Sequence, residues 1–200
     1  MPTTDDRATK KARADEFKAA WKEAFPISTS GTLEAMAPFF DSPWPGVRGR
    51  MLRAVGKRHM VEGVPLLVEA AERETDDSVL HSIALSLRDL RDVRAADTLW
   101  TMAEKDSAGE SGADMAALQG LCLLGDDRAI PIALSWYHSD GASLTERTKR
   151  QVAVFDLVLL QSSNGDKAVA DLLAGETSWR RRRLIRRAKR RAERWLARHR

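Results

Sequence analysis

The sequence predicts an all-α protein in which about four pairs of helices stack side by side, between an extra N-terminal helix and a basic C-terminal helix. Apolar residues recur at helical spacing along the chain, and the strict alternation that marks half-buried strands is absent. The apolar ends of successive first helices are 35, 34 and 35 residues apart, at Val55, Leu90, Leu124 and Leu159. A fixed period of this length with two helices per unit is typical of an α-solenoid.

The N-terminal part is expected to contain two helices before the repeats begin. Residues 4–25 carry the first helix, because Phe17, Trp21 and Phe25 lie on one apolar stripe. Pro26 is expected to end this helix, and residues 28–31 are expected to form a turn. A short helix follows over residues 33–40, distorted by Pro38, and residues 43–46 interrupt the chain before the first pair.

Four helical pairs then follow, and we treat residues 1–200 as one domain with an N-terminal helix at 1–30, the array at 31–175 and a basic helix at 176–200. The predicted pairs are 47–56 with 60–71, 78–90 with 93–104, 113–124 with 128–137, and 144–160 with 168–173.

The clearest junction between paired helices lies at residues 121–134. Gly125 suits the left-handed position that closes a helix, and Asp126 or Asp127 suits the N-cap of the next one. The acidic pairs Asp5-Asp6 and Asp76-Asp77 also lie near helix starts, so we expect all three pairs to cap helices rather than to catalyse.

The motifs at these junctions resemble those of HEAT repeats, particularly the short bacterial kind. The matching segments are Val47-Arg48, Val64-Pro65-Leu66-Leu67, Leu124-Gly125-Asp126 and Ala129-Ile130-Pro131-Ile132-Ala133-Leu134. The resemblance covers about residues 31–175 and implies a right-handed superhelix whose second helices line the concave surface. It also implies a binding surface rather than an activity, although a few bacterial members are DNA glycosylases or bilin lyases.

Composition and charge limit the class of protein. The hydrophobic content of 43% and charged content of 31% are typical of a globular chain. The single cysteine, Cys122, fits a reducing compartment and a packed position in the core. No apolar run is long enough to span a bilayer. We therefore expect a cytoplasmic protein. Residues 178–200 hold 12 Lys/Arg and one acid, a net charge of +11, which leaves −7 for residues 1–177.

No catalytic, metal or cofactor site is recognisable. Phosphate-binding glycine loops and nucleophile elbows are absent. His59, His81, His138 and His199 lie far apart, without the spacing of metal ligands. We therefore expect no cofactor, metal ion or small-molecule substrate, and we expect a protein that is not an enzyme. The hypothesis of an enzyme accessory of the bilin-lyase type is based on fold analogy alone.

Two residues in the third pair are candidates for binding a protein partner. On a helical wheel Ile132 and Trp136 lie opposite the face formed by Ile130, Ala133 and Leu134. If the second helix lines the concave surface, Trp136 is placed to contact a partner, since tryptophan is favoured at interfaces. Burial of Trp136 against the next repeat is the alternative.

The strongest local feature is the basic amphipathic helix at the C-terminus. Its narrow apolar stripe includes Leu184, Ile185, Ala188 and Trp195. Its basic surface, called the arginine face below, consists of Arg182, Arg183, Arg186, Arg187, Lys189, Arg190, Arg191, Arg194 and Arg198. Three roles remain open. The stripe docks on the last repeat as a cap, or the arginine face binds phosphates. In the third role the helix binds an acidic groove of a partner protein or a membrane surface, of which the membrane fits the preference for arginine over lysine less well.

These features predict a non-enzymatic interaction or scaffold protein. It would hold a protein partner on its concave face, near Trp136, with the arginine face adding electrostatic attraction. The alternative is a nucleic-acid-binding protein that contacts DNA or RNA phosphates through the C-terminal helix, with a repair glycosylase as its enzymatic extreme.

Overall fold

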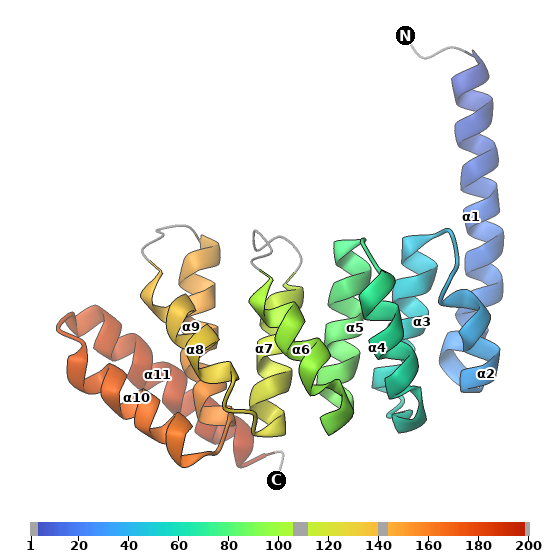
Figure 1. The fold of residues 1–200 in the computed structure, drawn as a ribbon. Coiled ribbons are helices and arrows are strands. Elements are labelled where there is room, and N and C mark those ends of the chain that lie inside the picture. The colour runs from blue at the N-terminus through green and yellow to red at the C-terminus, as the bar shows by residue number, and fades with distance from the viewer. Residues whose placement is uncertain (1–3, 106–111, 140–143, 199–200) are drawn as a thin grey trace.

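The computed structural model describes residues 4–105, 112–139 and 144–198. Every regular element in these residues is helical, and the helices form an array of stacked pairs, so the predicted all-α solenoid is confirmed (Figure 1). Across the described residues no helix is both long and apolar enough to cross a membrane.

The helices follow the predicted order, with shifts at their ends. Helix α1 (Thr4–Ser30), helix α2 (Leu33–Met36) and a 3-10 turn (Ala37–Phe39) precede the array. The four pairs are α3 (Pro45–Lys57) with α4 (Val64–Arg73), α5 (Asp77–Leu90) with α6 (Ala96–Glu104), α7 (Ala113–Leu124) with α8 (Ala129–His138), and α9 (Leu144–Leu159) with α10 (Ser163–Gly175). Helix α11 (Trp179–Leu196) follows. Helices α4 and α6 begin later than predicted because 3-10 turns precede them, at Val61–Gly63 and Val93–Ala95.

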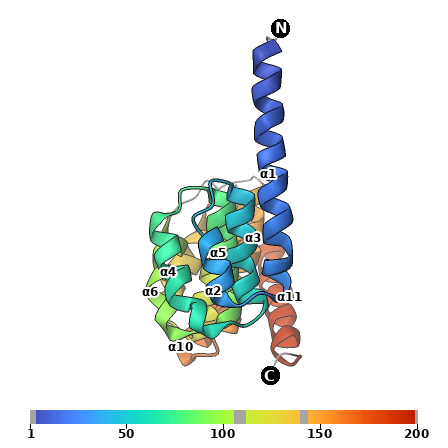
Figure 2. The same cartoon turned by 90° about the vertical axis from the view of Figure 1, so that its right-hand side faces the viewer.

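The helices form two layers (Figure 2). The first helices α3, α5 and α7 pack on one another in sequence, α7 also meets α9, and α11 packs on α9 as the next member of this layer. The second helices α4, α6, α8 and α10 form the other layer and touch one another at few positions, if at all. Helix α11 therefore occupies the place that the first helix of a fifth pair would take.

Small residues bring the first helices together. A Cβ atom at Gly56 of α3 would overlap Ser86 of α5, lying 2.7 Å from its Cβ and Oγ atoms. The Ser86 hydroxyl donates across this contact to the Leu52 carbonyl at 2.9 Å. The first helices therefore form the more closely packed layer. The expectation that the second helices line the concave surface stays a prediction.

Helix α1 does not end at Pro26, as the sequence predicted, but continues to Ser30. Proline removes one backbone N–H from the helix, yet the hydroxyls of the next residues bond to carbonyls one turn back: Ser28 and Thr29 to Phe25, at 2.7 and 3.1 Å, and Ser30 to Pro26 at 3.2 Å. These bonds hold the last turn in helical form, so residues 28–30 are helical and the chain turns only at Gly31.

The junction at residues 121–134 has the predicted form. Gly125 has φ +76°, and the amides of Gly125 and Asp126 donate to the Cys122 and Leu121 carbonyls, which closes α7. The N-cap of α8 is Arg128 rather than either aspartate, although the Asp126 carboxylate accepts from the Arg128 amide at 3.0 Å. Asp127 instead joins this pair to the next, by accepting from Ser162 Oγ at 2.8 Å.

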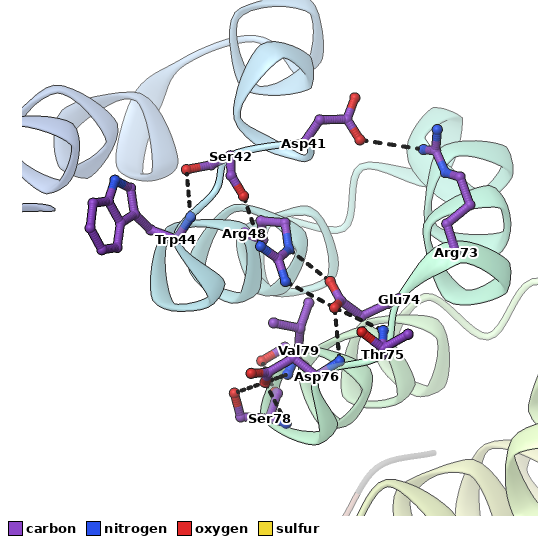
Figure 3. A network of polar contacts seen from close by, with 11 residues as sticks. Asp41, Ser42, Trp44, Arg48, Arg73, Glu74, Thr75, Asp76, Ser78 and Val79 are labelled. Atoms are coloured by element: carbon purple, nitrogen blue, oxygen red, sulfur yellow. Dashed lines mark hydrogen bonds and ion pairs between the residues drawn. The ribbon is translucent and has the colours of Figure 1, made fainter.

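The Val-Arg motif of the first pair is a structural contact between repeats (Figure 3). Arg48 donates from Nε and Nη2 to the two oxygens of Glu74, at 2.8 and 2.9 Å, and from Nη1 to the Ser42 carbonyl at 2.8 Å. Burial alone would raise the pKa of Glu74, but the bonds from Arg48 and from two backbone amides lower it overall. Next to it, Asp76 caps α5 by accepting from the amides of Ser78 and Val79.

Candidate functional site

Helix α11 docks on the array through its apolar stripe. Ser178 caps the helix, and Ile185, Ala188 and Ala192 are buried against α9. The small residues in this row allow close packing. Trp195 is half-buried, and the guanidinium carbon of Arg91 lies 5.8 Å from the centroid of its ring. The first of the three predicted roles, docking as a cap, is therefore what the structure shows, and it leaves the basic side of the helix outward.

The arginine face is a surface of nearly unneutralised charge. Lys189 is half-buried and the other eight members are exposed. None of the nine forms an ion pair with a carboxylate of the described residues. The two that do bond, Arg182 and Arg194, donate to the backbone carbonyls of Glu176 and Arg190 and so keep their charge.

Charge is divided between the two layers. Helices α3, α5, α7, α9 and α11 together contain 18 Lys/Arg and 6 Asp/Glu, a net charge of +12. Helices α4, α6, α8 and α10 contain 2 Lys/Arg and 6 Asp/Glu, a net charge of −4. The layer of first helices therefore attracts anions, chiefly at its α11 end.

A cavity of about 490 Å³ lies between α9 and α11, on the same layer as the arginine face. Its lining is Gln119, Thr148, Gln151, Val152, Phe155, Asp156, Arg180, Arg183, Leu184, Arg187, Ala188 and Arg191. It combines apolar walls with cations and amides, which is the composition of pockets that bind small molecules.

Polar side chains from three helices meet at one end of this cavity. Arg88 of α5 donates to Gln119 Oε1 at 3.0 Å, and Gln119 of α7 donates from Nε2 to Asp156 Oδ1 at 3.4 Å. Asp156 of α9 has no exposed surface, and burial raises the pKa of its carboxyl group well above the usual range. Asp156 is therefore held by a hydrogen bond from Gln119 in surroundings that disfavour its charged form.

Sequence reasoning missed this group of residues. Gln119 and Asp156 each lie on a different helix and belong to no motif. A single acid within the apolar run 152–160 was the available signal, since an acid there must be buried.

The predicted protein-binding residues Ile132 and Trp136 lie elsewhere. Both are half-buried and pack against the core from α8, in the layer opposite α11. The Trp136 ring lies 5.2 Å from Lys149 Nζ, and Lys149 is itself buried and paired with Asp114 at 3.2 Å. The structure therefore does not bring Trp136 and the arginine face together. The Trp136 ring is half-buried beside Lys149 of the next repeat, and its role in binding a partner stays a prediction.

Other candidates for chemistry have structural positions. Cys122 is buried, and burial raises the pKa of its thiol, which suits a core residue rather than a nucleophile. In the part of the chain that the structure describes, no three His, Cys, Asp or Glu side chains come together as a metal site would need. His199 and the side chains of Asp5 and Asp6 lie outside the described residues.

Comparison with protein families matches part of the chain. Residues 33–113, from α2 to the start of α7, match the family model for HEAT repeats. No curated protein matches the chain.

Proposed function

We propose, from the premise that this chain belongs to the HEAT-repeat family, that it is a non-enzymatic interaction protein that holds an acidic segment of a protein partner on its arginine face. HEAT repeats generally mediate contacts between proteins. The observation that carries the proposal is the docked helix α11, whose apolar stripe is buried while the nine residues of the arginine face form no ion pair with the described carboxylates. Arginine suits this role because its planar guanidinium binds carboxylates through two parallel hydrogen bonds.

The size of the basic surface favours a short protein segment over a long polyanion. Helix α11 has 18 residues, so it is about 27 Å long, and about eight residues of extended chain would cover it. Beyond it the rest of the chain has a net charge of −7 over residues 1–177, which repels an extended polyanion.

Affinity capture from the native host tests this proposal. The bait is the full chain, compared with the triple variant Arg186→Gln, Arg190→Gln, Arg194→Gln. All three side chains are exposed and lie outside the cavity between α9 and α11, so the fold is kept and three charges are removed. We expect a partner that resists nuclease treatment, that crosslinks to α11 and that the variant does not capture.

A matched control removes the same charge elsewhere. Lys10, Lys11 and Lys22 are exposed on α1, and their triple substitution by Gln should leave capture of the partner unchanged. The proposal fails if both triple variants lose the partner equally, or if nuclease treatment releases everything that the wild-type chain captures.

Nucleic acid is a second candidate, because the layer formed by α3, α5, α7, α9 and α11 has a net charge of +12. Fluorescence anisotropy with a 20-base-pair duplex over a range of salt concentrations tests it. If three members of the arginine face contact phosphates, their triple Gln variant should make the slope of log K against log salt less steep by about 2.7. A slope that is equal in wild type and variant excludes this surface as the contact.

We also propose that the chain acts in the cytoplasm and as one domain. The first proposal rests on the single, buried Cys122, which fits a reducing compartment. The second rests on the continuous packing of the first helices from α3 to α7, which leaves no break in the array.

A further inference from the structure

Four cations of α11 line the cavity between α9 and α11. Arg180, Arg183, Arg187 and Arg191 recur every three or four residues, so they lie on one side of the helix. Arg183, Arg187 and Arg191 also belong to the arginine face, whereas Arg186, Arg190 and Arg194 lie outside the cavity. The cavity is therefore tested with other residues than those that test the proposed protein partner.

The apolar walls of the cavity fit a flat ring. Val152 and Phe155 of α9 face Leu184 and Ala188 of α11, and the Phe155 and Leu184 side chains are half-buried. The guanidinium of Arg191 lies 5.8 Å from the Phe155 ring centroid, which places a cation over this wall. Planar rings pack well on such a wall, because aromatic and guanidinium groups both stack.

The cations of the cavity have no anion. Arg183 and Arg187 are exposed and have no ion pair or hydrogen bond within the described residues. Arg180 has its guanidinium over the Trp179 ring, at 5.7 Å. The one carboxyl group in the lining, Asp156, is fully buried and bonds to Gln119, and among the described residues it forms no ion pair with these arginines. An incoming phosphate would meet guanidinium groups with free N–H donors.

The buried end of the cavity has an unused hydrogen-bonding atom. Asp156 Oδ1 accepts from Gln119, whereas Oδ2 is buried without any partner among the described residues. Buried polar atoms without partners are rare in folded proteins, so a hydrogen-bonding atom is missing beside Oδ2. A polar atom at the edge of a ligand's ring would supply it.

We propose that this cavity binds a small phosphorylated molecule with a flat, hydrogen-bonding ring, of the size and chemistry of a nucleoside monophosphate. The ring lies against Phe155 with its polar edge toward Gln119 and Asp156, and the phosphate lies between Arg183 and Arg187. The volume of about 490 Å³ holds one such molecule and not a longer chain. A free ligand is therefore the occupant.

Isothermal titration calorimetry with the full chain tests this proposal. The probes are the common nucleoside monophosphates, the matching nucleosides, inorganic phosphate and a single-stranded oligonucleotide. We expect at least one monophosphate to bind with a stoichiometry of one, and to bind about tenfold or more tightly than its nucleoside or phosphate alone, because both halves of the cavity contribute.

Two matched variants separate the cavity from general electrostatics. Arg183→Gln with Arg187→Gln removes two cavity cations, and Arg186→Gln with Arg190→Gln removes two cations at the same spacing outside it. All four side chains are exposed, so both variants should keep the helical circular dichroism of the wild type. We expect the cavity variant to lose about tenfold or more in affinity and the control to stay within about twofold.

Three results would overturn the site: no monophosphate binding at millimolar concentration, equal losses in the two variants, or binding of the oligonucleotide without binding of any free monophosphate. None of them bears on capture of a protein partner, which is tested with residues outside the cavity.

Discussion

The contact between Gly56 and Ser86 offers the sharpest test of how the array is built. Gly56 is the last residue but one of α3, and replacing it by Ala would by itself favour the helix by at most about 0.5–1 kcal/mol. The new methyl group, however, meets the backbone and side chain of Ser86, with its Cβ and Oγ only 2.7 Å away. Because backbone atoms cannot rotate away, α5 must shift. Such overpacking costs about 1–3 kcal/mol, and the bond from Ser86 to the Leu52 carbonyl, about 1 kcal/mol, is lost.

The net effect of Gly56→Ala should therefore be a destabilisation of about 2 kcal/mol, or a fall of about 4–8 °C in the midpoint of thermal unfolding for a chain of this size. Circular dichroism at 222 nm measures it. Gly175 at the end of α10 is the matched control, because nothing lies within 4 Å of a Cβ atom there, so Gly175→Ala should leave the midpoint unchanged or slightly higher. If Gly56→Ala were as stable as wild type, the first helices would not pack as closely as described.

Three further substitutions have defined outcomes. The pKa of Glu74 is lowered in the folded state, so its contact with Arg48 stabilises the fold above pH about 4.5, and this stabilisation is lost as the pH falls. Glu74→Gln should therefore lower the urea midpoint at pH 7 but hardly at pH 3. An equal loss at both pH values would contradict this. The pKa of Asp156 is raised, so stability should fall as pH rises above the usual value of about 3.8. Asp156→Asn should remove that slope between pH 5 and 8, and a slope that persists would mean another group titrates. Trp136→Ala should lower the free energy of unfolding by about 2 kcal/mol, because the ring packs on Lys149. The variant should still capture the partner. Loss of capture by a folded variant would instead place Trp136 in the binding site.

The candidate site could be predicted only in part. The amphipathic pattern of residues 179–196 correctly indicated a helix with a buried stripe and an outward basic side, because both properties belong to one helix and follow its 3.6-residue period. Trp136 lay beyond such reasoning. A helical wheel separates two sides of α8, but it does not tell which side meets solvent and which meets Lys149 of the next helix.

The sequence by itself determined the helices, their pairing and the repeat period, because these depend on apolar spacing and on local bonds such as the turn at Gly125. Even locally it failed at Pro26, where the helix continues and the hydroxyls of the next residues bond to carbonyls one turn back. Tertiary structure decided which layer packs closely and that α11 packs on α9 beside a cavity lined by Asp156. The physical reason is that helix spacing is set by contacts between residues about thirty positions apart, such as Gly56 with Ser86, whose fit no single helix reveals.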